Sequence, residues 1–302
     1  MKYDFDFASL FKKANIFSLI IFFASLLFII FKGLNYGIDF KGGTLIELRV
    51  NDKNINITNI RDSFNSYTYG DINIKQFGDK KDYLIKIENM PDQGKDFIKT
   101  LKENINKKLQ SDISFRRVEK VGPKVSAELL ESGLIAIALS LFAMLFYIWI
   151  RFEWQFSLGS IVALFHDVVI TIGIFSLLSI EVNLSIIAAV LTIVGYSMND
   201  TVVIYDRIRE NLSKFNRINI NQISNLAINE TLSRTIITSV TTLLALMSIF
   251  ILGGDILKGF SFAMILGVII GTYSSIFVAA PILKYLKVSQ KTLEKKEEKI
   301  LP

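Results

Sequence analysis

Six long apolar runs, separated by charged segments, constrain this chain more than any other feature of its sequence. They cover residues 14–31, 132–150, 158–178, 184–204, 235–252 and 260–283. A helix needs about 20 residues to cross the hydrocarbon core of a bilayer, so each run is long enough to span a membrane with its flanks. Apolar residues make up 51% of the chain, which fits a polytopic membrane protein better than a soluble domain.

The first apolar run has two possible interpretations, a membrane anchor or a cleaved signal peptide. A signal peptide has an apolar core of about 7–15 residues and then a cleavage site with small residues. The run 14–31 is longer, and FKGLNYG follows it. We therefore expect an uncleaved first span over 14–32, preceded by a short cytoplasmic N-terminus over 1–13.

The charged residues are distributed unequally between the two ends of the apolar runs. One set of ends carries most of the basic residues: Arg151, Arg207, Arg209, Lys214, Arg217, Arg234 and the lysines of the tail 285–302. The opposite connections carry only Glu181, Asp255 and Lys258. Because basic residues accumulate on the cytoplasmic side, both termini and the connection 205–233 are predicted to be cytoplasmic.

The net charge of +6 has the same explanation, because the basic residues lie beside the apolar runs. It therefore gives no reason to expect a nucleic-acid partner. The chain has no cysteine, which excludes disulfides, thiol catalysis and thiolate metal sites.

Residues 33–130 differ from the rest of the chain, with mixed charge and no apolar run of spanning length. The segment TLIELRV at 44–50 alternates as a strand does, and Phe97, Leu101, Ile105 and Leu109 recur at helical spacing. Gly78-Asp79 is a turn signal between two further strands. The predicted order is β-α-β-β-α-β, a ferredoxin-like α+β domain on the side of the membrane away from the cytoplasm. Nothing in this domain has a catalytic pattern.

Polar side chains interrupt the apolar run 184–204. Tyr196, Ser197 and Asp200 share one helix face there, and Asn199 lies at its edge. An ionisable group at this depth is costly and usually marks a transport pathway or a partner charge.

Two further runs of the region 131–284 carry polar stripes at helical spacing. In the run 235–252 the stripe contains Arg234, Thr238, Thr241, Thr242, Ala245 and Ser248. In the run 158–178 it contains Ser160, Ala163, Asp167 and Thr171, with His166 beside Asp167. Lipid does not satisfy such groups, so the stripes are expected to face one another, a cavity or a partner protein.

Asp200 lies about 25 Å along a helix that starts at Leu184, at 1.5 Å per residue, and therefore towards the cytoplasmic side. Arg234 enters the next run from the same side. An Asp200–Arg234 pair is thus geometrically reasonable. A positive partner favours the ionised carboxyl whereas burial favours the protonated one, so movement of the partner would let Asp200 gain and lose a proton.

Each of these features also has a structural interpretation. Asp200 could form a fixed salt bridge, and His166 could simply satisfy its polar neighbour. The hydroxyl stripe of 235–252 is, by itself, typical of close helix packing, as is the GxxxG pair Gly267 and Gly271.

Six motifs, in order along nearly the whole chain, resemble the SecF family of the bacterial SecDF protein-export complex. They are GIDFKGGT (37–44), VGPKVSAEL (121–129), RFEW (151–154), ALFHD (163–167), VGYSMNDTVVIYDRIREN (194–211) and TLSRTIITS (231–239). One departure is Ser126, where the family usually has glycine.

The resemblance implies a subunit that pairs with SecD, the two forming a split transporter of the resistance-nodulation-division superfamily. Such a complex associates with the SecYEG channel, YajC and YidC in the membrane lipid. It uses the proton-motive force to complete preprotein export after the ATP-driven SecA step. By matching motif, Asp200 and Arg234 correspond to the proton-pathway acid and its arginine partner. A family signature would lie at the junction between the first span and the external domain, and its residues here would be Gly37, Asp39, Phe40, Gly42 and Gly43.

The chain has no phosphate-binding loop of the GxxxxGK[ST] type. We therefore expect a transport subunit that is not an enzyme and holds no cofactor or metal. Two alternatives are a proton-coupled exporter of small molecules and a non-transporting assembly subunit of the translocase. The first would need larger external domains, and the second would tolerate a neutral replacement of Asp200 that preserves packing.

Overall fold

The computed structural model describes residues 5–52, 55–64, 72–76, 81–88, 94–215, 218–290 and 292. The chain divides into two compact units, one made of residues 1–35 and 135–302 and the other of residues 36–134. The first is a bundle of long helices and the second is an α/β domain. The helix α5 (Pro123–Arg151) runs from the second unit into the first.

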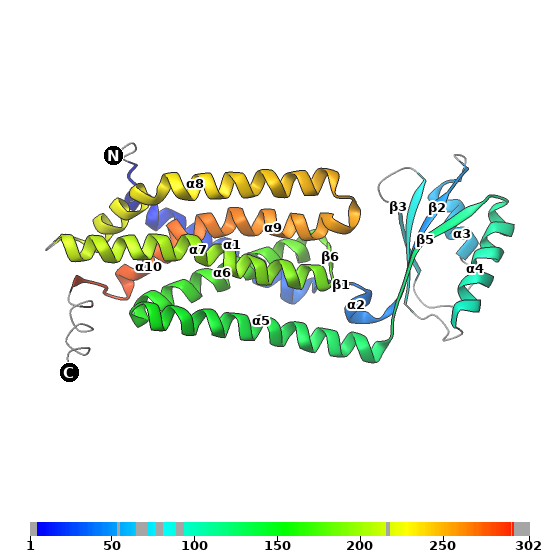
Figure 1. Ribbon diagram of the computed structural model, residues 1–302, viewed down its shortest axis with the longest axis horizontal. Helices are drawn as coiled ribbons and strands as arrows, with labels where there is room; N and C mark the ends of the chain where they lie inside the picture. The colour runs from blue at the N-terminus through cyan, green and yellow to red at the C-terminus, as the bar shows by residue number, and fades with distance from the viewer. Residues whose placement is uncertain are drawn as a thin grey trace. The chain divides into compact units, whose positions relative to one another are not determined.

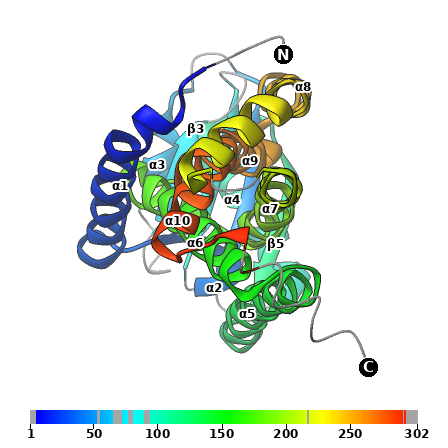
Figure 2. The same cartoon turned by 90° about the vertical axis from the view of Figure 1, so that its left-hand side faces the viewer.

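The helical unit contains α1 (Phe11–Phe31), α6 (Trp154–Leu178), α7 (Leu184–Lys214), α8 (Ile220–Leu252) and α9 (Asp255–Ser274). A single turn, η1 (Ala8–Leu10), precedes α1, and α9 continues through a π-helix (Ser275–Ala279) into α10 (Ala280–Tyr285). With α5, the described residues form six helical segments long and apolar enough to cross a membrane, as predicted. α6 to α9 run side by side in Figure 1, and Figure 2 shows α9 between α6, α7 and α8.

Several helices extend beyond the apolar runs that predict them. α7 continues to Lys214 and α8 already begins at Ile220, so most of the connection 205–233 between the two apolar runs is helical. Charged residues stabilise these extensions, because Glu210 binds Lys214 one turn later at 2.5 Å. Hydropathy marks the part of a helix that lies in hydrocarbon, and not where the helix ends.

Small residues let the helices of the bundle approach closely. A methyl group on Gly173 of α6 would collide with Ser25 of α1, and one on Gly267 of α9 would collide with Ile193 of α7. At Gly271, one turn further along α9, it would lie 2.9 Å from the Cβ atom of Ser197. The predicted packing role of this glycine pair is therefore confirmed.

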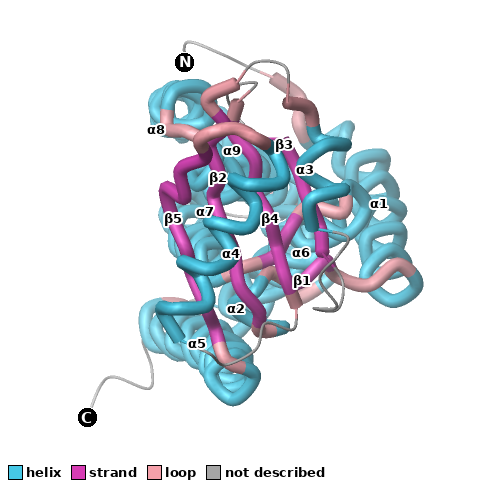
Figure 3. The backbone as a smooth tube through the Cα atoms, turned by 90° about the vertical axis from the view of Figure 1, so that its right-hand side faces the viewer, coloured by secondary structure: helices cyan, strands magenta, loops and turns pink. Residues whose placement is uncertain are grey.

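The second unit has the predicted β-α-β-β-α-β order. Its elements are β2 (Gly43–Val50), α3 (Ile57–Phe64), β3 (Ile72–Gln76), β4 (Asp82–Ile87), α4 (Gly94–Leu109) and β5 (Ile113–Val121). The described strands pair antiparallel in the order β3-β4-β2-β5, and α3 and α4 lie on one face of the sheet (Figure 3). The predicted turn at Gly78-Asp79 lies outside the described residues.

The core of this unit lies between the sheet and its two helices. Ile46, Leu48 and Val50 alternate along β2 and are fully buried, as predicted for one strand face. Phe64 of α3 and Leu101 of α4 belong to the same apolar cluster. The unit therefore has its own hydrophobic core, separate from that of the helical bundle.

Candidate functional site

Asp200 lies inside the helical bundle on the buried face of α7. Its residue is 3% exposed, and Ser197 and Thr201 on the same face are also buried. The Oδ2 atom of Asp200 is buried and accepts no hydrogen bond. A carboxylate without a full set of partners in a membrane helix is held at a considerable cost in free energy.

Arg234 of α8 is exposed on the surface of this chain, in contrast to Asp200. No ion pair joins the two residues in the part of the chain that the structure describes. The pairing expected from the sequence is thus not a direct contact among the described residues.

Asp167 of α6 is the centre of a buried hydrogen-bond network between three helices. Its carboxylate is fully buried, and Oδ1 lies 2.9 Å from Nδ1 of the neighbouring His166. The hydroxyls of Ser197 on α7 and Ser274 on α9 both donate to Oδ2, at 2.6 and 2.7 Å. The hydroxyl of Thr171 donates to the main-chain oxygen of Asp167 at 2.8 Å. The stripe predicted on α6 therefore faces the interior of the bundle.

The hydroxyl stripe predicted on α8 faces away from the bundle. Thr241, like Arg234, is exposed, and Thr238 and Thr242 are half-buried. Thr238 and Thr241 donate to main-chain oxygens of their own helix, so neither hydroxyl is satisfied by another element. The sequence leaves three possibilities for this stripe: another polar stripe, a cavity or a partner protein. For the hydroxyls of Thr238 and Thr241, another stripe or a cavity within this chain is therefore excluded.

The remaining polar residues predicted on α7 differ in whether they face the interior of the bundle or the surface of the chain. Tyr196 is half-buried, and its hydroxyl is buried without a hydrogen-bond partner. Asn199 is exposed on the surface of the chain. α7 therefore directs Ser197 and Asp200 inwards and Asn199 outwards.

The sequence did not reveal the hydroxyls that α9 and its π-helix contribute. Ser274 binds Asp167, Ser275 lies 2.8 Å from the hydroxyl of Thr201, and Thr272 lies 2.8 Å from that of Ser239 on α8. Tyr205 of α7 donates to the main-chain oxygen of Ala279 at 2.9 Å. π-helical turns are often found at functional sites, but nothing in the residue types of 275–279 indicates one.

A groove of about 330 Å³ lies beside His166, between α1, α6 and the end of the last span. Its lining is mainly apolar and includes Leu19 and Phe22 of α1 and Ile282 of α10. The His166 ring stacks on Phe22 with centroids 6.4 Å apart, and its Nε2 atom is buried without a hydrogen-bond partner. One nitrogen of His166 is therefore bound to Asp167, and the other is without a partner in a side chain that lines the groove.

The junction signature forms a tight turn at the start of the α/β unit. Gly37 precedes the single-turn helix α2 (Ile38–Lys41), which contains Asp39 and the buried Phe40. Gly42 and Gly43 follow with φ of +80° and +123°. A side chain on Gly43 would lie 2.6 Å from the main-chain oxygen of Ile87, so this position requires glycine for both space and conformation.

Ser126, the departure from the family motif, is buried against this turn. Its hydroxyl lies 3.2 Å from the main-chain oxygens of both Ile38 and Gly122. The serine therefore adds a polar contact where glycine would leave these oxygens to other partners.

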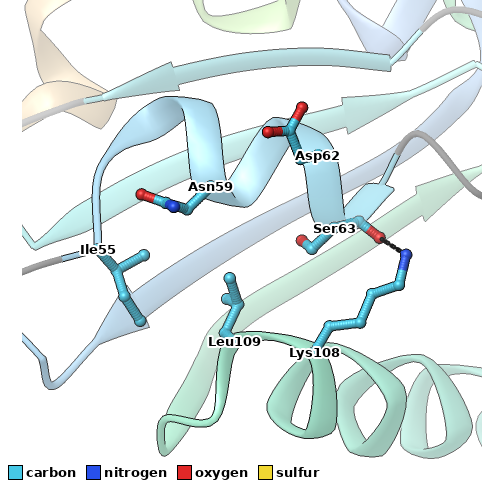
Figure 4. Close-up of a pocket in the computed structure, with 6 residues that line it drawn as sticks. All are labelled: Ile55, Asn59, Asp62, Ser63, Lys108 and Leu109. Carbon is cyan, nitrogen blue, oxygen red and sulfur yellow. Dashed lines mark hydrogen bonds between the residues drawn. The ribbon is translucent and has the colours of Figure 1, made fainter.

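A second cavity of about 330 Å³ lies in the α/β unit between α3 and α4 (Figure 4). Lys108 crosses it and donates to the main-chain oxygen of Ser63 at 3.3 Å. Asp62 and Lys108, its charged residues, both have interaction partners. Among the described residues, no group of three or more His, Asp or Glu side chains is placed to hold a metal ion.

Comparisons with known proteins identify relatives over nearly the whole chain. The family model "Protein export membrane protein SecD/SecF, C-terminal" matches residues 101–289, and the model "SecD/SecF GG Motif" matches residues 27–53. The chain is 42% identical over 298 residues to the protein translocase subunit SecF of Rickettsia rickettsii, covering 97% of this chain and 96% of that protein. It is 43% identical over 282 residues to SecF of Cereibacter sphaeroides, covering 91% and 87%.

Solved structures of SecDF have the same fold. A SecDF from Thermus thermophilus matches 94% of this chain with a TM-score of 0.84 and 34% identity. A SecDF in a super-membrane-facing form matches 98% of it with a TM-score of 0.67 and 31% identity. The chain spans 39% and 40% of the lengths of these two SecDF chains.

Proposed function

The chain belongs to the SecF family of protein translocase subunits, and on this basis we propose that it works with a SecD subunit to couple proton entry to preprotein export. The SecDF chains that it resembles are more than twice as long, which supports a second subunit as the remaining part. On this proposal the chain is a transport subunit and not an enzyme, and it uses the proton-motive force after the SecA and SecYEG step.

The observation that carries this proposal is the state of Asp200. Its Oδ2 atom is buried without a hydrogen bond, and among the described residues no ion pair joins it to Arg234, which is exposed. A structural salt bridge would hold the two groups in direct contact. A carboxyl group that is buried but incompletely bound is suited to gaining and losing a proton as its surroundings move.

The exposed face of α8 supports a membrane-embedded partner. Arg234 and Thr241 are exposed there, and Asn199 is exposed on α7. A charged guanidinium group facing lipid is costly, so such residues usually face another protein or a water-filled cavity. We assign this face to contact with SecD, which would complete the surroundings of Asp200 and could supply the rest of the proton path.

The charges at the helix ends support the orientation. Arg151, Arg207 and Arg209 gather where α5 ends, α6 begins and the extended part of α7 lies, and they form ion pairs there with Asp206, Glu230 and Glu153. This end would be cytoplasmic in a bacterial inner membrane. The α/β unit would then be periplasmic, where it would meet the emerging preprotein. YajC and YidC would be further partners of the complex, and membrane lipid its surroundings.

The test of the proposal is export by membranes that contain Asp200→Asn in a complex assembled to the normal level. The amide keeps the size of the side chain but cannot ionise, so the gradient-stimulated step should be lost while the ATP-driven step remains. Asp206→Asn on the same helix is the matched control, because Asp206 is 58% exposed and pairs with Arg151 near the cytoplasmic end.

The control should export at the wild-type rate in the presence of the gradient. If Asp200→Asn also does so, proton coupling through Asp200 is refuted and the assembly-subunit alternative gains support. If binding of SecD is lost instead, Asp200 serves the interface.

A further inference from the structure

Asp167 combines complete burial with the absence of a positive partner. Its carboxylate is 0% exposed, and the described residues place His166 but no lysine or arginine within ion-pair distance of it. Two serine hydroxyls donate to its Oδ2 atom, so that oxygen acts only as an acceptor. The one position left for an added proton is Oδ1, which faces Nδ1 of His166 at 2.9 Å.

His166 is placed between this buried carboxylate and the groove. With Asp167 ionised, Nδ1–H donates to Oδ1, and Nε2 carries a lone pair. Nε2 is buried with no hydrogen-bond partner, in a side chain 7% exposed that lines the groove. Tyr285, which also lines the groove, is 71% exposed, so the groove extends to the surface of the chain.

We propose that Asp167 is a second proton-binding site of this subunit, separate from Asp200, and that His166 is the residue through which its proton enters and leaves. A proton carried by water in the groove bonds to Nε2, the Nδ1–H bond breaks, and that proton bonds to Oδ1 of Asp167. The imidazole ring remains neutral in its other tautomer. The carboxylate becomes a carboxylic acid, so the pair changes from one negative charge to none without exposing Asp167.

Among the described groups around the pair, His166 is the titratable side chain that contacts the Asp167 carboxylate. α1 contributes Phe22, Ser18 and Asn15, none of which titrates near neutral pH. α7 contributes Ser197 and, one turn on, Asp200. α9 contributes Ser274 and Tyr273, whose hydroxyl is bound to the main-chain oxygen of Ala14. α10 contributes Tyr285.

Ser274 would transmit the protonation state to the last span. Its single hydroxyl hydrogen has two acceptors, Oδ2 of Asp167 at 2.7 Å and the main-chain oxygen of Gly271 at 3.1 Å. Hydrogen bonds to a carboxylate are roughly twice as strong as bonds between neutral groups. Neutralising Asp167 removes that preference, so the hydroxyl turns to Gly271 and the link between α6 and the start of the π-helix weakens.

Infrared difference spectroscopy of the assembled SecD–SecF complex in lipid, after a rapid drop in pH, tests this site. The wild type should show a carbonyl band from protonated Asp167 that is missing in Asp167→Asn, whereas the band from Asp200 should remain in that variant. In His166→Gln the band should appear more slowly by about 10²–10⁴-fold, the usual contribution of a positioned acid–base group. Glutamine can donate to Asp167 but does not relay a proton.

Asp200→Asn is the control that separates the two sites, and it should leave the Asp167 band and its rate unchanged. An unchanged spectrum in Asp167→Asn overturns the second site, and an unchanged rate in His166→Gln overturns the role of His166. The inference rests on the proposed proton coupling for its purpose, but the spectra report protonation without export. Failure of the export test at Asp200 would therefore not contradict protonation of Asp167. Likewise, an unchanged spectrum in Asp167→Asn would not contradict proton coupling through Asp200.

Discussion

At Gly271 the backbone of α9 lies so close to α7 that a side chain would disturb the buried network. A Cβ atom there would be 2.9 Å from the Cβ atom of Ser197 and 3.1 Å from its Oγ atom. Ser197 is one of the two serines that bind Asp167, and Ser274 and Ser275 also lie near the main-chain oxygen of Gly271. The absence of a side chain at Gly271 thus allows three helices to share one carboxylate.

Gly271→Ala should therefore destabilise the protein, by about 1–3 kcal/mol as is typical of an overfilled core, despite the better helix propensity of alanine. The matched control is Gly195→Ala, because a Cβ atom at Gly195 of α7 would meet nothing within 4 Å. Thermal unfolding of the purified complex in lipid should show a lower midpoint for the first variant only. Equal midpoints for the two variants would contradict the close approach.

At the residue scale, the sequence predicts acids better than their partners. Asp200 and Asp167 are evident because a carboxylate in an apolar run is rare. Ser274 and Ser275 are not, because serine is common in membrane helices and bonds to its own helix at little cost. Which hydroxyl reaches which carboxylate depends on the contacts between helices, and these are not encoded by spacing within one helix.

Within the α/β unit, the pairing of β2 and β4 places Arg49 beside Asp82 on the sheet. The guanidinium group binds both carboxylate oxygens, at 2.6 and 2.7 Å, and Arg116 of β5 lies 3.6 Å from one of them. The hydrogen bonds from Arg49 lower the pKa of Asp82 from its ordinary value of 3.8, against the opposing effect of burial. The folded sheet therefore favours the ionised form of Asp82.

The stability that comes from this pair should depend on pH in one direction. Because the folded-state pKa is lower than the unfolded-state value, the contribution is present above that value, about 3.9, and is lost as the pH falls through the folded-state pKa. Asp82→Asn should cost about 1 kcal/mol at neutral pH and progressively less below pH ~4. Denaturant unfolding of the isolated unit at several pH values measures this. A cost that does not change with pH would contradict the pairing.

At the scale of elements, the sequence predicts the β-α-β-β-α-β order and the membrane runs but misplaces helix ends. The alternation of apolar and polar residues in a strand, and the length of an apolar run, follow directly from which side chains are buried, and both are visible in a sequence. The extensions of α7 to Lys214 and of α8 from Ile220 are polar, and ion pairs such as Arg207 with Glu230 stabilise them. The π-helix at Ser275–Ala279 has no sequence signal, and its contact with α7, in which the Tyr205 hydroxyl donates to the main-chain oxygen of Ala279, depends on tertiary packing.

At the scale of the whole molecule, the motifs predict the family and the α/β unit between the first and second spans. The orientation of the chain in the membrane is predicted from the basic residues at the helix ends, because these accumulate on the cytoplasmic side. The lysines of the tail 285–302 contribute to that prediction, and those at 291 and 295–299 lie outside the described residues. Arg234 is exposed on α8, so under the proposed function a second subunit would complete the surroundings of the proton site.

The chain contains no cysteine, so single cysteines can test the orientation without a background. Ser213→Cys on α7 and Ser289→Cys after α10 are at exposed positions predicted to be cytoplasmic, and Glu103→Cys on α4 is at an exposed position of the α/β unit. In intact spheroplasts a membrane-impermeant maleimide should label only Glu103→Cys. After permeabilisation it should label all three, which shows that each thiol is reactive. Labelling of the two serine positions in intact cells would reverse the topology and place the α/β unit, with any preprotein contact, in the cytoplasm.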